Sequence, residues 1–226
     1  MTSQADAHRA STDRGGAAPS WAEAERAAFV RTLHATDPAA PTLCEGWTVH
    51  RLVAHLVSRE HRPAAALRDG TAAVGDEPSL NALLDGPDAP PYRDLVDRFA
   101  AGPPRWSPFS WAAETTNLIE YVVHHEDVRR GGPEPAEPRV LPTDMVRAVW
   151  ERLGPMARLA HRSSPTGVVH VVPGGPRRTV RRRTDAVAVV GDPVELALYT
   201  LGRRDEAEVD LLGRPETVEA FRAAQR

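Results

Sequence analysis

The residues best suited to chemistry lie in the stretch 117–127, where Glu120 and His124 are four positions apart. On a helix of 3.6 residues per turn, the two side chains lie within about 40° of each other on one face. A carboxylate and an imidazole at this spacing can bind one metal ion together. Apolar neighbours indicate that this face points into a protein core. A surface Glu–His pair or a hydrogen-bonded core histidine would show the same spacing.

His55 is a candidate for a third metal ligand. It lies in the apolar run 53–57, where an imidazole needs a partner for its nitrogens. It can be a core histidine, or it can join Glu120 and His124 as two histidines and one carboxylate from two facing helices. Three protein ligands with an open position are typical of a catalytic metal. This donor set suits Zn²⁺ best, and Fe²⁺, Ni²⁺ or Mn²⁺ less well.

The elements that position these residues are separated by breaks rich in proline and glycine. Apolar periodicity and capping residues predict helices in the first part of the chain. They cover residues 21–35, from a Thr48 cap to about 68, about 78–85, 92–101 and 114–130. The four longer helices, joined by loops, suggest a bundle.

The second part of the chain has a different pattern. Residues 131–138 are too rich in glycine and proline for a helix and are typical of a linker. After them we expect a helix over 145–159, strands at 167–172, 177–183, 186–190 and 209–212, and helices over 193–201 and from about 215. The fold class is therefore α+β. The expected organisation is a disordered tail (1–19), a helical bundle (20–130), a linker (131–138) and a small α+β domain (139–226).

Composition excludes several kinds of protein. The chain has 226 residues with 28 basic and 31 acidic side chains, and every basic residue is arginine. Without lysine there can be no Schiff-base enzyme and no P-loop. The formal net charge of −3 argues against nucleic acid or an anionic membrane as a partner. The single cysteine, Cys44, forbids an internal disulfide. No apolar run reaches the length of a membrane span, and no signal peptide is evident, so we expect a cytoplasmic protein.

Two groups of motifs resemble a known family. Residues 45–49 (EGWTV) and 52–57 (LVAHLV), together with 120–127 (EYVVHHED), resemble the mycothiol-dependent maleylpyruvate isomerase family. Within that family the tract 124–130 resembles an uncharacterised actinobacterial branch. The stretches 190–196 and 201–203 resemble the small C-terminal domain of the family more weakly.

The resemblance implies a DinB-like metal-binding four-helix bundle followed by a small α/β domain related to sterol-carrier-like folds. It implies a divalent metal, usually zinc, held by His55, Glu120 and His124, and the use of the thiol cofactor mycothiol. Family members differ widely in substrate, so isomerase activity is not carried over. The alternatives are a non-catalytic metal- or small-molecule-binding protein, or a regulatory partner that only presents a surface.

Such a site would activate a thiol. A metal with an open position lowers the pKa of a bound thiol, and the thiolate attacks an electrophilic, possibly anionic, small-molecule substrate. The result would be thiol transfer or thiol-assisted isomerisation. Positive charge for an anion must come from arginine, and Arg203 in the Leu-Gly-Arg motif is one candidate. It can equally be an ordinary surface arginine.

Residues near the proposed ligands have two interpretations each. Asp127 can orient a ligand histidine, or it can pair with Arg129 or Arg130. Cys44 precedes a predicted helix start, where a thiolate is favoured, but a buried structural thiol fits as well. His125 and Glu126 face away from His124 and are expected at a solvated edge or a domain contact.

Overall fold

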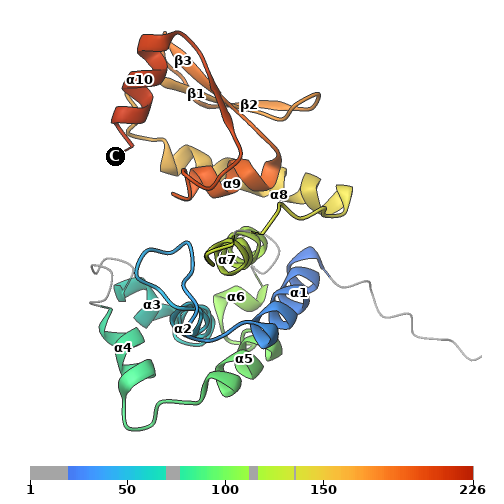
Figure 1. Cartoon of the computed structure of the whole chain (residues 1–226), viewed down its shortest axis with the longest axis vertical. Helices are drawn as coiled ribbons and strands as arrows, with labels where there is room; N and C mark the ends of the chain where they lie inside the picture. Colours follow the sequence, from blue (N-terminus) through green and yellow to red (C-terminus); the bar gives the residue numbers. More distant parts are fainter. Residues whose placement is uncertain (1–19, 70–76, 112–116, 135, 226) are drawn as a thin grey trace, which may run out of the picture.

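The computed structural model describes residues 20–69, 77–111, 117–134 and 136–225 (Figure 1). These residues form helices and one four-stranded sheet. The helices are α1 (Trp21–Ala35), α2 (Val49–His61), α3 (Pro63–Asp69), α4 (Pro78–Asp85), α5 (Tyr92–Ala101), α6 (Pro108–Trp111), α7 (Leu118–Arg130), α8 (Thr143–Ala160), α9 (Pro193–Thr200) and α10 (Pro215–Ala223). The strands are β1 (Gly167–Val171), β2 (Arg177–Arg181), β3 (Ala186–Val190) and β4 (Asp210–Leu212). The expected tail, 1–19, lies outside the described residues.

The first helix begins and ends where the sequence predicts. Ser20 caps α1, its hydroxyl accepts the Glu23 backbone N–H, and the Glu23 carboxylate accepts the Ser20 N–H at 2.8 Å. This reciprocal arrangement is a capping box. The bounds of α5 also match the expected 92–101.

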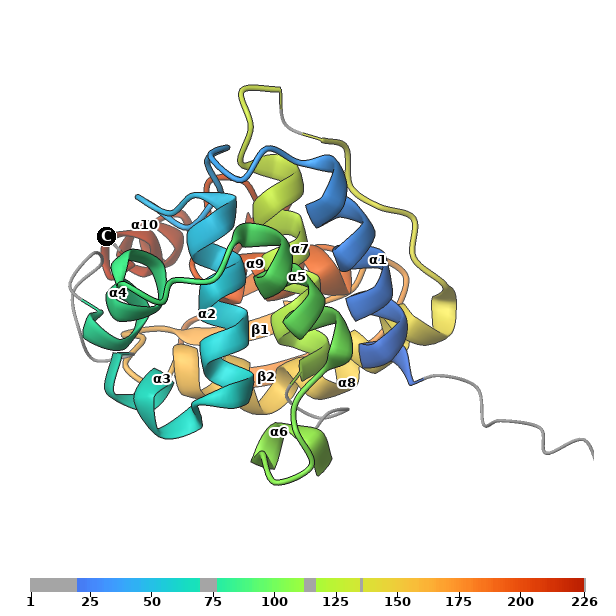
Figure 2. The same cartoon turned by 90° about the horizontal axis from the view of Figure 1, so that it is seen from below.

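The prediction of one long helix from Thr48 to about residue 68 was wrong. Thr48 does cap α2, but the helix ends at His61 and α3 begins at Pro63. Proline has no N–H to donate, and its ring clashes with the carbonyl four residues earlier, so a straight helix cannot continue through Pro63. The break turns α3 and α4 away from α2 (Figure 2).

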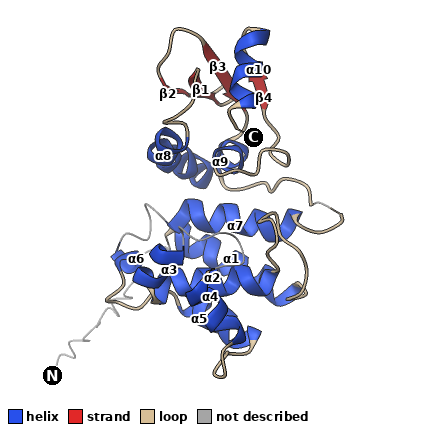
Figure 3. Ribbon diagram, turned by 90° about the vertical axis from the view of Figure 1, so that its left-hand side faces the viewer, coloured by secondary structure: helices blue, strands red, loops and turns tan. Residues whose placement is uncertain are grey.

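Helix α7 lies between two layers of structure. Figure 2 shows α1, α2, α5 and α7 side by side, and Figure 3 shows α8 and α9 on the opposite side of α7. The predicted first turn, 114–116, lies outside the described residues, and α7 starts at Leu118. Because both sides are covered, its polar residues are buried with its apolar ones. His125 and Glu126 are therefore not at a solvated edge, since they are 2% and 0% exposed. Both contact Arg139 at the start of the second part, so the alternative expectation, a contact between the two parts, is the one that fits.

The second part of the chain is a mixed α and β unit. The sheet has the order β2-β1-β3-β4, in which β1 and β3 are parallel and the outer strands are antiparallel to their neighbours. Helices α8 and α9 lie between this sheet and α7 (Figure 1). The strands fall within the predicted ranges, so the mixed helix-and-sheet class is confirmed.

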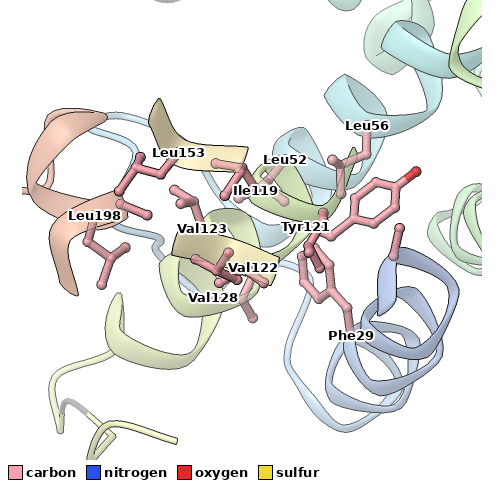
Figure 4. Packing of buried hydrophobic residues seen from close by; sticks show 14 of the residues in the cluster. Phe29, Leu52, Leu56, Ile119, Tyr121, Val122, Val123, Val128, Leu153 and Leu198 are labelled. Atoms are coloured by element: carbon pink, nitrogen blue, oxygen red, sulfur yellow. The ribbon is translucent and has the colours of Figure 1, made fainter. Parts of the chain in front are cut away.

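One hydrophobic core joins the two parts. Figure 4 shows Phe29 and Leu56 on the bundle side and Leu153 and Leu198 on the other, with Val123 of α7 between them. All five are at most 2% exposed. This packing fixes α7 against both parts, so residues from both can meet at one site. No described helix is long and apolar enough to cross a membrane.

Candidate metal centre

The structure brings His55, Glu120 and His124 together. Glu120 Oε1 lies 3.2 Å from His124 Nε2 and 3.6 Å from His55 Nε2. One ligand atom from each of the three residues lies within 4.8 Å of the others. Two ligands at about 2.0–2.1 Å from a tetrahedral zinc ion are roughly 3.3–3.4 Å apart, so these separations suit a shared cation. The donor set, two imidazole nitrogens and a carboxylate oxygen, is one that zinc accepts.

Two helices hold these ligands. The apolar neighbours of His55, among them Val53, Ala54 and Leu56, are fully buried and fix the rotation of α2. The indole ring of Trp47 lies 5.1 Å from the His55 imidazole, centroid to centroid. Glu120 and His124 occupy successive turns of α7, as their spacing predicts.

Asp127 orients His124. Its Oδ2 lies 2.8 Å from His124 Nδ1, which leaves Nε2 facing Glu120. A carboxylate on the far nitrogen is the usual support of a metal-binding histidine. The alternative pairing of Asp127 with Arg129 or Arg130 is not found, because both arginines pair with Glu126.

Arg203 reaches the site from the C-terminal part of the chain. Its Nε and Nη2 donate to the two carboxylate oxygens of Asp127 at 2.7 and 2.5 Å, and Nη1 donates to the Leu201 carbonyl. Its side chain is only 16% exposed, so it is not an ordinary surface arginine. Arg203 and Asp127 therefore join the two parts of the chain that Figure 3 shows.

Cys44 completes the polar cluster. It is half-buried, and its Sγ lies 3.2 Å from Asp127 Oδ2, 3.0 Å from Arg203 Nη2 and 3.9 Å from His124 Nδ1. Cys44, His124 and Asp127 therefore form a second group with ligand atoms within 4.8 Å. Arg203 donates to both oxygens of Asp127 and to Cys44 Sγ, so the polar atoms of this second group are already in use and the first group is the better candidate for a cation.

Burial and hydrogen bonding shift the pKa values of these residues in opposite directions. Burial lowers the pKa of His55. Burial also disfavours a charged His124, but hydrogen bonds to Asp127, Cys44 and Glu120 raise its pKa well above the ordinary value. Burial would raise the pKa of Glu120, but its hydrogen bonds with His124 and His55 hold it well below its usual range. Asp127, buried beside His124 and Arg203, has a pKa of about 2.

Sequence reasoning missed Arg59. It lies one turn after His55 on α2, with Nε 3.6 Å from Glu120 Oε1. Its guanidinium stacks 4.0 Å above the Phe109 ring, and Nη1 donates to Asn117 Oδ1 at 2.9 Å. The spacing of four from His55 is the signal that could have found it, because such a residue shares the face of a proposed ligand.

Two cavities adjoin the cluster. One of about 600 Å³ lies between the loop that carries Cys44 and the turn that carries Arg203. A smaller cavity, of about 190 Å³, has His55 in its wall. Trp47 belongs to the wall of both.

Comparison with known proteins identifies the helical part. Residues 20–107 match the family model described as the mycothiol maleylpyruvate isomerase N-terminal domain. The matched residues, fewer than half of the chain, are similar to that domain. The match includes His55, whereas Glu120 and His124 lie beyond it. The family resemblance expected from the sequence is thereby confirmed.

Two solved structures are similar in fold to this chain. One is the mycothiol-dependent maleylpyruvate isomerase, with 20% identity and a TM-score of 0.56, and the other is a histidine-to-alanine mutant of that enzyme, with 19% identity and the same score. Each comparison covers 84% of this chain and 90% of the other. A search of curated proteins found no significant match.

Proposed function

We propose that this protein is a metal-dependent enzyme that uses a low-molecular-weight thiol, mycothiol, in thiol transfer to a small electrophile or in its thiol-assisted isomerisation. The observation that carries the proposal is the convergence of His55, Glu120 and His124. Cys44, whose Sγ lies 3.9 Å from His124 Nδ1, connects this group to the cavity that residues from both parts of the chain line. The family of the helical part supports the choice of thiol.

The proposed metal is Zn²⁺, held by His55 Nε2, His124 Nε2 and Glu120 Oε1. When bound, it would lower the pKa of a thiol that ligates it. Two neighbouring residues hold one of the proposed ligands, His124, in the orientation that metal binding needs. Asp127 holds the His124 ring so that Nε2 faces Glu120, and Arg203 holds Asp127 from the other side.

The cavity of about 600 Å³ is the proposed thiol site. Its volume lies in the usual range for small-molecule sites, about 300–1,000 Å³. Cys44 and Arg203 are in its wall, and Arg203 is the proposed catalytic arginine. Because its charge is balanced by Asp127, we propose that it acts by fixing the polar cluster and by adding positive charge beside the thiol, rather than as a free clamp for an anion.

The proposal also covers the architecture. We propose that residues 20–130 are a DinB-like metal-binding four-helix bundle, that 131–138 link it to the second part, and that 139–226 form a sterol-carrier-like α/β domain. The buried pairs Arg130–Glu195 and Arg203–Asp127 support a fixed arrangement of the two, because each ion pair joins α7 to the second part. An actinobacterial source and a cytoplasmic location, where low-molecular-weight thiols are kept reduced, belong to the proposal.

The test has two measurements on purified protein. Elemental analysis should find about one equivalent of zinc in the wild type and His50→Ala, and none in His55→Ala. His50 is a matched control because it lies on the same helix but contacts Tyr92. Mycothiol should then raise the melting temperature only of the zinc-loaded protein. A wild type that refuses zinc would contradict the proposal. Zinc binding without a mycothiol effect would identify a non-catalytic metal-binding protein instead.

A further inference from the structure

The smaller cavity has features of a binding pocket beside the proposed metal ligands. It lies between α2, α3 and α4 and encloses about 190 Å³. A cavity of about 150 Å³ is large enough to hold benzene, so this one suits a compact molecule of about that size. His55 and Trp47 form the wall nearest the metal centre.

Ser58 is the residue in this wall with unused hydrogen-bonding capacity. It lies three residues after His55 on α2 and is 4% exposed, and its Oγ has no hydrogen-bond partner among the described residues. A buried hydroxyl without a partner is destabilising, and most such groups in proteins have a hydrogen-bond partner. A serine side chain changes rotamer at little cost, so the hydroxyl can turn toward an oxygen placed in the cavity.

The charges around the cavity select against an anion. Asp69 and Glu77 are in its wall, and no arginine is among the described residues that line it. Glu77 is balanced by Arg51, which lies 2.5 Å away, while Asp69 accepts two backbone N–H groups at the start of α4. A carboxylate beside Asp69 would therefore be repelled by it, and no arginine among the described residues of the wall offsets that repulsion.

We propose that this cavity is the substrate pocket and that the Ser58 hydroxyl recognises a carbonyl oxygen of a compact, neutral electrophile. The assignment rests on the proposed function, which places the thiol in the larger cavity. The two ligands would then lie in cavities that have Trp47 as a common wall residue. When the thiolate forms a carbon–sulfur bond with a conjugated carbonyl compound, the displaced π electrons move to the carbonyl oxygen, and the Ser58 O–H donates to that oxygen.

The test uses three probes of similar size on zinc-saturated protein, with ligand-detected NMR titration as the readout. The probes are cyclopentanone, its hydrocarbon counterpart methylenecyclopentane, and cyclopentanecarboxylate. The wild type should bind the ketone more tightly than the other two. Ser58→Ala should weaken ketone binding by about three- to tenfold, the worth of one hydrogen bond, and leave hydrocarbon binding unchanged. Ser58→Leu should abolish both, because the larger side chain fills the cavity.

Ser79→Ala is the matched control, because Ser79 is on α4 but is not among the residues that line this cavity. Equal ketone affinity in wild type and Ser58→Ala, ketone binding that survives Ser58→Leu, carboxylate binding as tight as ketone binding, or no binding of any probe would each overturn the assignment. Zinc content and the mycothiol effect are measured on the same proteins. If the wild type refuses zinc, the proposed function fails, and the titration of the metal-free protein still decides whether Ser58 forms a carbonyl site.

Discussion

Two pairs of histidines in this protein have their rings close together, and they differ in what surrounds them. The rings of His55 and His124 have centroids 5.4 Å apart, and Glu120 lies within 3.6 Å of both Nε2 atoms. The rings of His161 and His170, in the second part of the chain, have centroids 5.7 Å apart. There, both nitrogens of His170 and Nε2 of His161 have no hydrogen-bond partner in the part of the chain that the structure describes.

The comparison shows that acidic partners, rather than burial, distinguish a cation site from a core pair. His124 and His161 are buried to a similar degree, 8% and 6% exposed. Hydrogen bonds with carboxylates overcome the effect of burial on the pKa of His124. Burial, together with the nearby charge of Arg204, lowers the pKa of His161 to about 4. Burial, together with the charges of His161 and Arg178, lowers the pKa of His170 to about 3. The second pair is therefore neutral at pH 7, and none of the candidate metal-binding groups among the described residues includes it.

Removing the Glu120 carboxylate, which lies near both His55 and His124, should have the largest effect on zinc affinity. Glu120→Ala leaves two histidines without an acidic partner, as in the second pair. Loss of a residue that only supports a ligand costs about 10–100-fold in metal affinity, so loss of a ligand should cost more than about 100-fold. Competition with a chelator measures the zinc affinity. His170→Ala is the control and should bind zinc as the wild type does. Equal affinity in Glu120→Ala would show that Glu120 is not a ligand.

Removing the support of His124 should have the next largest effect. In Asp127→Asn the side chain keeps its shape but loses its charge, so we expect zinc affinity to fall about 10–100-fold. The same chelator competition measures it, with Asp144→Asn as the control because Asp144 forms an exposed ion pair on α8. A wild-type affinity in Asp127→Asn would mean that the contact with His124 Nδ1 does not prepare the site.

Lowering the pH should reduce the stability of the protein through His161 and His170. The folded-state pKa values of His161 and His170 lie below the unfolded value of about 6.5, so the unfolded state binds more protons as the pH falls. Stability contributed by these neutral histidines is full above pH 6.5 and is lost as the pH falls toward 4. At pH 5 the loss is about 2 kcal/mol for each histidine.

Urea unfolding at pH 7 and pH 5 measures this loss. The wild type should lose stability between the two pH values, and His170→Leu should lose about 2 kcal/mol less, whatever its stability at pH 7. Replacement of the exposed His34 by Leu is the control and should leave the difference unchanged. An equal pH dependence in wild type and His170→Leu would show that the second pair is not held neutral.

The smallest effect is expected at the contact between the two parts of the chain. Arg203→Lys keeps the charge but loses the two-point contact with Asp127, since lysine is a single point donor. Zinc affinity should fall only a few-fold, because Asp127 still contacts His124 directly. Arg147→Lys, at an exposed ion pair, is the control. A larger loss than in Asp127→Asn would mean that Arg203 acts on the ligands by a route other than Asp127.

Much of the fold follows from local patterns in the sequence. The Ser20 cap and the apolar periodicity predict α1, and Tyr92 to Ala101 is bounded by proline and glycine, which predict α5. Proline at 63 carried the information that α2 must break, but the apolar periodicity on either side of it suggested continuity. The burial of both sides of α7 could not be predicted, because only tertiary packing brings α8 and α9 against its second side.

The candidate site, like the fold, could be predicted only in part from the sequence. The spacing of Glu120 and His124 predicts that they share a helix face, and the apolar setting of His55 marks it as a residue that needs a partner. The contacts of Asp127 with Cys44 and Arg203 join residues 83 and 76 positions apart, so no periodicity could indicate them. Arginine was the expected source of positive charge in a chain without lysine, and the structure uses Arg203 for an internal carboxylate.

The position of a bound metal tests the central claim most directly. Crystals of the protein grown with Zn²⁺, with anomalous diffraction measured on both sides of the zinc absorption edge, locate the ion independently of any assay. We expect one strong peak about 2.0–2.2 Å from His55 Nε2, His124 Nε2 and a carboxylate oxygen of Glu120. The absence of a peak at this position would contradict the account. A peak between Cys44, His124 and Asp127, with the Arg203 guanidinium displaced by the ion, would contradict it as well.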